Sequence, residues 1–232
     1  MIGPSGHRVS GASGFSSITR SPDHPITRFL LIPLLLLPLA AALDSSSTLS
    51  RAQALYADGR GHSARFVHTY TPAGFANAKK ESGEIWVQSP QRLRFEYSSP
   101  EKKIFTYDGA EGRLYVPEDR QLTRQKFSED QREKLPLLLL TDPERFSREY
   151  SVTPEQASDA GDRLILKPRE ARPELAWLRM TVARDGTVPE LAYEDASGNR
   201  TEFQFSGWRQ QKARPEGDFR ITGPAGTRIL EN

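Results

Sequence analysis

The side chains that could carry acid–base or nucleophilic chemistry are few in this chain. After residue 43 the only histidines are His62 and His68, and cysteine is absent altogether. The lack of cysteine excludes a disulfide framework, a thiolate nucleophile and a zinc site built on thiolates. Ser63 and several carboxylates could complete a Ser–His–Asp arrangement, but no Gly-x-Ser-x-Gly motif follows residue 43. A hydrolase that uses His68 or paired carboxylates is therefore an alternative with no motif behind it.

The same residues offer little to a metal ion or a cofactor. His62 and His68 lie six positions apart and would share a face of one strand, but no third ligand follows at comparable spacing. We interpret His68 as a half-buried packing residue. The acidic pairs Glu129/Asp130 and Glu194/Asp195 are typical of a helix start and a solvated turn. Phosphate-binding and dinucleotide-binding loops are missing from the sequence. It predicts no cofactor, no metal and no enzymatic activity.

The first 42 residues have the pattern of a cleaved secretory signal peptide. Three arginines precede an apolar run from Phe29 to Leu39, and Ala40–Ala42 provides a small-residue cleavage site. The alternative is a retained membrane anchor. However, the uncharged run Phe29–Leu43 has 15 residues, fewer than the ~20 that a spanning helix needs. We predict cleavage after Ala42 and a single exported domain over residues 43–232, located in the periplasm. No cysteine is available there for lipid attachment.

Removal of this segment changes the charge balance. The whole chain has 32 Lys and Arg against 30 Asp and Glu, and the first 42 residues contain three of the former and one of the latter. The remaining chain therefore has 29 of each sign. A balanced charge argues against binding to nucleic acid, which depends on a strong excess of positive charge.

The residues Glu81–Gly109 predict three short strands. Apolar side chains alternate with polar ones at Ile85 and Val87, and again at Leu93, Phe95 and Tyr97. Pro90 and Pro100 separate the strands, and Asp108-Gly109 is typical of a hairpin turn. The alternation predicts a sheet with one apolar and one charged face.

The rest of the chain is mostly strand as well. Period-two patterns or strand-length runs predict further strands at 63–70, 113–116, 121–127, 150–153, 163–167, 177–184, 190–195, 201–208 and 219–222. Residues 210–217 are predicted to be a polar loop. In total we expect about ten strands in a strongly curved antiparallel sheet.

Three helical segments interrupt this pattern. Leu49, Ala52, Leu55 and Tyr56 follow helical spacing near the start of the exported chain. A second helix is predicted to start at residues 128–131, and a third after Asp142 with Pro143 in its first turn. Leu137–Leu140 forms an apolar join between these two. Because three short helices cannot form a second domain, we expect them to cover one face of the sheet.

Several motifs, in order, resemble the periplasmic outer-membrane lipoprotein carrier family, LolA. The similarity extends from about Ser63 to Leu230, and no single piece of it is specific alone. It is carried by Gly83–Val87 with Pro90, Leu93–Tyr97, Pro100, Tyr107–Gly109, Leu114–Pro117, Leu135–Leu140, Leu166–Pro168, Asp185–Thr187 and Phe219–Thr227.

The resemblance implies an incomplete antiparallel β-barrel with a helical lid over an apolar cavity. It also implies a non-enzymatic carrier, expected as a monomer, that receives acylated lipoproteins from an inner-membrane ABC exporter and delivers them to an outer-membrane acceptor. Exposing an acyl chain to water costs ~0.8 kcal/mol per methylene, so such cargo needs a shield. The residues expected to form the acyl-chain cavity are Leu93, Phe95 and Tyr97 on one wall, Leu178, Met180 and Val182 on the facing wall, and Leu137 and Leu140 in the lid.

One position departs from the family pattern. The best-studied branch has an arginine directly before the proline that matches Pro90, where it holds the lid closed through hydrogen bonds, and this chain has Ser89. Arg92 and Arg94 are predicted to point away from the face that carries Leu93. The alternative function is a lipid-sensing or lipoprotein-sensing regulatory module on the same fold, which would bind a ligand without handing it to a membrane.

Overall fold

The computed structural model describes residues 45–128, 135–155 and 157–231. The predicted signal peptide and the helix start predicted at Glu129–Gln131 lie outside these residues. Within them, no helix has both the length and the apolar character needed to cross a membrane.

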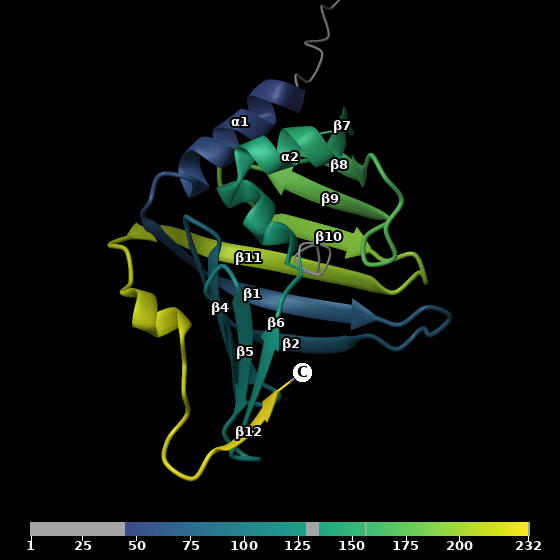
Figure 1. Cartoon of the computed structure of the whole chain (residues 1–232). Coiled ribbons are helices and arrows are strands. Elements are labelled where there is room, and N and C mark those ends of the chain that lie inside the picture. The colour runs from purple at the N-terminus through teal and green to yellow at the C-terminus, as the bar shows by residue number, and fades with distance from the viewer. Residues whose placement is uncertain (1–44, 129–134, 156, 232) are drawn as a thin grey trace, which may run out of the picture. The chain divides into compact units, whose positions relative to one another are not determined.

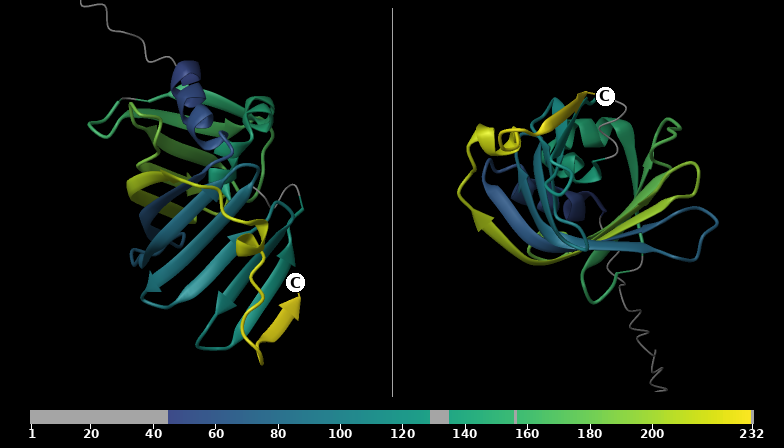
Figure 2. Two further views of the ribbon diagram at one scale, coloured as in Figure 1. Left: turned by 90° about the vertical axis from the view of Figure 1, so that its left-hand side faces the viewer. Right: turned by 90° about the horizontal axis from the view of Figure 1, so that it is seen from below.

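One twelve-stranded sheet organises the described chain (Figure 1). Its strand order is β12-β6-β5-β4-β3-β2-β1-β11-β10-β9-β8-β7, so the sheet is open, with β12 and β7 at its two edges. The end-on view in Figure 2 shows it curving around the helices. The strands are β1 (Gly61–Thr71), β2 (Lys79–Gln88), β3 (Arg92–Ser99), β4 (Lys103–Tyr107), β5 (Glu111–Val116), β6 (Gln121–Lys126), β7 (Tyr150–Pro154), β8 (Asp162–Pro168), β9 (Trp177–Val182), β10 (Glu190–Glu194), β11 (Arg200–Gln211) and β12 (Arg228–Glu231).

The mainly-β, incompletely closed architecture expected from the sequence is confirmed, with two corrections. The strand predicted at 219–222 is wrong, because Phe219 ends the short 3₁₀ helix η3 (Glu216–Phe219) and no strand follows directly. The chain instead forms β12 at Arg228–Glu231, which pairs with β6 in a parallel sense. The sheet is therefore not wholly antiparallel.

Three helical segments cover the concave face of the sheet. They are α1 (Ser45–Tyr56), the 3₁₀ helix η2 (Pro136–Thr141) and α2 (Pro143–Glu149). The predicted apolar stripe of α1 is confirmed, since Leu49, Ala52 and Tyr56 are buried. Burial also places the Tyr56 hydroxyl where it accepts a hydrogen bond from the Val188 backbone N–H at 3.2 Å. This contact ties α1 to the segment that precedes β10.

We call Pro136–Glu149 the lid. The predicted apolar join Leu137–Leu140 is itself helical, and all four leucines are buried. A 3₁₀ helix has three residues per turn, so four consecutive leucines face every direction around its axis. All can be buried because η2 packs between α1, α2 and β2. The predicted cap of the next helix is confirmed: the Asp142 side chain accepts from the Arg145 backbone N–H at 3.1 Å.

The opposite face of β2–β5 is covered by the C-terminal segment, residues 212–227. Arg94 donates to the Asp218 carbonyl at 2.7 Å, Arg113 to the Phe219 carbonyl at 3.3 Å, and the Arg214 guanidinium lies 4.3 Å from the centre of the Trp86 ring. Phe219 is fully buried. The sequence predicted this face of the sheet to be charged and solvated, which is wrong at Trp86 because these contacts bury it.

Trp86 also depends on a neighbouring glycine. A Cβ atom at Gly61 would lie only 2.2 Å from the Trp86 ring. Gly61 and Gln88 face each other across β1 and β2, and the Gln88 side chain bonds both the N–H and the carbonyl of Arg214. The segment is therefore fixed to the sheet through main-chain and side-chain contacts.

Candidate functional site

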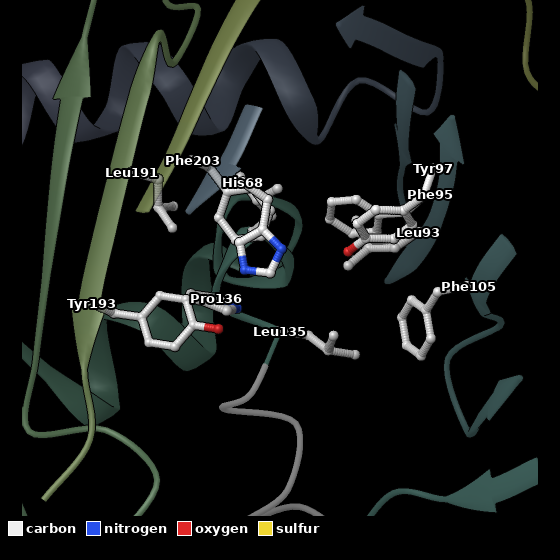
Figure 3. A pocket seen from close by; sticks show the side chains of 11 residues that line it. His68, Leu93, Phe95, Tyr97, Phe105, Leu135, Pro136, Leu191, Tyr193 and Phe203 are labelled. Atoms are coloured by element: carbon white, nitrogen blue, oxygen red, sulfur yellow. The ribbon is translucent and has the colours of Figure 1, made fainter. Parts of the chain in front are cut away.

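A cavity of about 200 Å³ lies between the concave face of the sheet and η2. Figure 3 shows side chains from both halves of the sheet converging on it, with Leu135 and Pro136 closing one side. Its lining comprises His68, Leu93, Phe95, Tyr97, Phe105, Leu135, Pro136, Leu137, Leu191, Tyr193 and Phe203.

Strand register explains why these side chains meet. His68 on β1 is opposite Phe203 on β11, which is opposite Leu191 on β10. On the other half of the sheet, Phe95 on β3 is opposite Phe105 on β4. Directly paired residues point to the same face of a sheet, so each set forms a row across the concave side.

Aromatic rings join the two rows. Phe66 lies 5.3 Å from Phe95, 5.0 Å from Tyr97 and 6.1 Å from Phe203, each in an edge-to-face arrangement. Such pairs add about 0.5–1.5 kcal/mol each beyond the burial of their area. The base of the cavity is therefore a continuous aromatic surface, suited to hydrocarbon.

The sequence placed eight residues at this site, and the structure brings four of them to the cavity. Leu93, Phe95, Tyr97 and Leu137 line it. The other four do not line it; they are fully buried in the core and are Leu140, Leu178, Met180 and Val182. The β9 residues are buried because α1 packs against that strand. Only a displacement of the helices would expose them.

Several lining residues were not selected from the sequence. Phe203 and Tyr193 sit on strands that the sequence predicted, and their alternation with polar neighbours places them on an inward face. The sequence does not reveal the order of the strands in the sheet, because β1 pairs with β11 across more than a hundred residues. The alternation indicates that Phe203 faces inward, but only the strand register shows that Phe203 lies opposite His68.

A buried charged group adjoins the cavity. His68 Nδ1 lies 3.3 Å from Glu81 Oε2, and Lys103 Nζ lies 2.6 Å from Glu81 Oε1. Glu81 is only 8 % exposed. Lys103 also lies 4.5 Å from the centre of the Tyr97 ring. The imidazole of His68 is stacked on Phe203, with centroids 4.5 Å apart and planes 9° from parallel.

These neighbours set the charge states of the group. Burial lowers the pKa of His68, and the Glu81 carboxylate opposes that effect only in part. Burial alone would raise the pKa of Glu81, but the hydrogen bond from Lys103 and the positive charges near the carboxylate together outweigh burial and lower that pKa. Burial raises the pKa of Tyr97 and of Tyr193. At neutral pH His68 is uncharged beside an ionised Glu81.

The side chains considered for nucleophilic catalysis or metal binding do not meet at the cavity. Ser63, the one nucleophile considered with His68, accepts a hydrogen bond from Gln211 Nε2 at 2.6 Å. His62 lies 3.1 Å from Asp58 and away from the cavity lining. In the described part of the chain, no cluster of three histidine, aspartate or glutamate side chains could hold a metal ion.

A hydrogen bond connects the lid to the sheet near Ser89. Gln91, in the turn between β2 and β3, donates from Nε2 to Asp142 Oδ2 at 3.0 Å. Asp142 therefore caps α2 with one carboxylate oxygen and holds Gln91 with the other. Arg92 and Arg94 point away from the lid, as predicted: Arg92 lies 3.9 Å from Glu216, and Arg94 contacts Asp218.

Comparison with known proteins gives a consistent result. The family described as outer membrane lipoprotein carrier protein LolA matches residues 59–222. An outer-membrane lipoprotein carrier protein from Xanthomonas axonopodis pv. citri is 30 % identical over 74 % of this chain and 82 % of its own length. One from Pseudomonas fluorescens is 24 % identical over 89 % of this chain and 99 % of its own length.

A solved structure extends the likeness to the fold. An uncharacterized conserved protein from Thermus thermophilus superposes with a TM-score of 0.51 at 10 % identity, covering 81 % of this chain and 98 % of that one. The family match includes well over half of the chain, and the curved sheet and the apolar cavity agree with it. This chain belongs to the LolA family of outer membrane lipoprotein carrier proteins.

Proposed function

We propose that this chain is a periplasmic carrier that binds the acyl chains of lipoproteins in the cavity beneath η2. The observation that supports this most is the cavity itself, an aromatic and aliphatic surface closed by an apolar helix. The curated relatives are named outer-membrane lipoprotein carriers. A signal peptide over residues 1–42 and a single carrier domain over residues 43–232 would place it in the periplasm.

The size of the cavity requires that the lid move during loading. A volume of about 200 Å³ is below the roughly 300–1,000 Å³ of pockets that enclose whole ligands. The lid in this position is therefore closed too far to admit several acyl chains. Displacement of η2 together with α1, which packs against β9, would remove Leu137 and Leu140 from the core and expose the inward side chains of β9: Leu178, Met180 and Val182. All eight residues selected from the sequence would then form the acyl-chain surface.

The lid is constructed so that it can open at moderate cost. Its described polar tie to the β2–β3 turn is the Gln91–Asp142 hydrogen bond, and one such bond contributes about 0.5–1.5 kcal/mol. At the far end of the lid, Glu149 also accepts hydrogen bonds from the Arg169 backbone N–H and the Arg172 side chain. The η2 part adheres through apolar contacts of its leucines, which an acyl chain can replace. Cargo would therefore compete with Leu137–Leu140 for the same surface.

A transfer assay between two membranes tests this function. The full exported chain is incubated with vesicles that contain an acylated lipoprotein and the inner-membrane ABC exporter, and then with outer-membrane vesicles. We expect a soluble complex of carrier and lipoprotein, followed by handover to the second membrane. Absence of any complex contradicts the proposal. A complex that forms but is never handed over supports the regulatory alternative instead.

A further inference from the structure

Part of the cavity wall is polar, although polar groups contribute nothing to the binding of a hydrocarbon chain. Of the lining residues only His68, Tyr97 and Tyr193 have polar side-chain atoms. Figure 3 shows the nitrogen-bearing edge of His68 turned toward the open space near Pro136 and Leu135. Burying a polar group without a partner is unfavourable, so this histidine needs an explanation beyond packing.

The neighbours of His68 favour one position for its proton. Glu81 Oε2 lies 3.3 Å from Nδ1 without a hydrogen bond between them, and the negative charge of this carboxylate favours the proton on that nitrogen. Lys103 binds the other carboxylate oxygen of Glu81, and stacking on Phe203 orients the imidazole ring of His68. In a neutral imidazole with a proton on Nδ1, Nε2 has a lone pair and can only accept. No described residue donates a hydrogen bond to it.

We propose that His68 Nε2 accepts a hydrogen bond from the N–H of an amide that joins an acyl chain to its carrier peptide. This inference rests on the proposed function, because it assumes that acyl chains occupy the cavity. It adds a chemical preference: chains linked through an amide are favoured over chains linked through an ester. An ester has acceptors only and would set an oxygen against the lone pair of Nε2.

Two ligands that differ in one atom test the preference. N-dodecanoylglycine methyl ester has an amide N–H, and its analogue has an oxygen at that position. Both are measured by displacement of an environment-sensitive apolar dye from the full exported chain. One hydrogen bond predicts that the amide binds about threefold to tenfold more tightly. Equal affinity, or tighter binding of the ester, overturns the inference.

Variants show whether His68 is responsible. His68→Phe retains an aromatic ring that can stack on Phe203 and removes the acceptor, so the affinity ratio should fall to about one. His62→Gln is the matched control, since His62 is also buried beside a carboxylate but lies outside the cavity lining; the ratio should stay at its original value. A preference that survives His68→Phe contradicts the assignment.

Titration of the unmodified chain gives an independent result that does not require the variant to fold. Protonation of His68 converts Nε2 into a donor, so the amide should lose its advantage as the pH falls well below the ordinary histidine pKa of about 6.5. The groups that face His68 are Glu81, Lys103, Lys79, Tyr97 and Tyr193. Glu81 remains ionised to lower pH than an ordinary glutamate, and both tyrosines stay neutral. A ratio that is constant with pH contradicts the inference.

The two proposals fail in different ways. If neither ligand displaces the dye, acyl chains do not bind and the carrier function itself is contradicted. If both displace it equally, the carrier function stands and only the role of His68 is lost.

Discussion

At the scale of single residues, Phe95 is the centre of the candidate site. It is in ring contact with Phe66, Tyr97, Phe105 and Phe203 and faces the cavity with only 6 % of its surface exposed. Its contacts come from both halves of the curved sheet. A change of polarity here alters the cavity without touching the outer face.

We predict that Phe95→Glu abolishes cargo loading. A carboxylate in an apolar cavity either stays charged at high cost or draws in water, and both exclude hydrocarbon. Val67→Glu is the matched control, because Val67 is 40 % exposed and lies outside the cavity lining. Loading is measured as the amount of lipoprotein released from membrane vesicles, with circular dichroism to compare the folds.

The control variant should load normally. Unchanged loading by a folded Phe95→Glu protein would remove this residue from the acyl-chain surface.

Residue-scale prediction from the sequence succeeded where a single strand carried the information. Leu93, Phe95 and Tyr97 alternate on β3, and all three reach the cavity. From the sequence, His68 was interpreted as a packing residue. Nothing along the chain indicates that Glu81 lies beside His68 or that Lys103 binds the same carboxylate. That group depends on the register of β1 with β2 and on the path of β4.

At the scale of elements, the lid and the β2–β3 turn form one unit. Asp142 begins α2 and also binds Gln91, so the start of that helix and its attachment to the sheet depend on the same carboxylate. Ser89, which stands where the best-studied branch has an arginine, lies two residues before Gln91 in the same turn. The Gln91–Asp142 hydrogen bond ties the lid to this turn.

We predict that Gln91→Glu loosens the lid. The introduced carboxylate has nearly the same shape as the amide but repels Asp142 and cannot donate to it. Hydrogen exchange of the Leu138 amide, whose N–H bonds the Leu135 carbonyl at 2.9 Å, should become about tenfold faster, which corresponds to ~1.4 kcal/mol. Apolar dye should also bind more readily.

Two further variants make the interpretation specific. Adding Asp142→Asn to Gln91→Glu restores a donor–acceptor pair and retains a good helix cap, so exchange should return toward its original rate. Gln204→Ala, at an exposed position on β11, should leave it unchanged. If Gln91→Glu alone has no effect on exchange or dye binding, the hydrogen bond does not hold the lid.

Elements were predicted well where local chemistry fixes them. The Asp142-Pro143 helix start and the Asp108-Gly109 turn both occur as predicted, since capping and turn formation depend on a few adjacent residues. The C-terminal region was predicted poorly. Phe219 has a strand-like sequence, but it is buried, and the Asp218 and Phe219 carbonyls accept hydrogen bonds from Arg94 and Arg113. These contacts favour a 3₁₀ turn against the sheet.

At the scale of the whole described chain, the sheet is a curved wall covered on both faces. The helices cover the concave face, and residues 212–227 cover the convex face of β2–β5. Asp108 links this segment to the β4–β5 turn. Although burial raises its pKa, bonds from two backbone amides, Arg113 and Arg220 lower it to about 2. The C-terminal segment therefore supports the convex face of the strands that carry Leu93 and Phe95. On the concave side, one described hydrogen bond joins the lid to the β2–β3 turn.

Photo-crosslinking is the most direct test of whether this concave surface holds acyl chains. A lipoprotein whose acyl chains carry a diazirine is loaded onto a protein of residues 43–232, irradiated, and mapped by peptide mass spectrometry. We expect adducts on the concave side of β3 and in the lid, at Leu93, Phe95, Tyr97 and Leu137. Adducts confined to convex-face residues such as Val67, or absent from a loaded carrier, would contradict it.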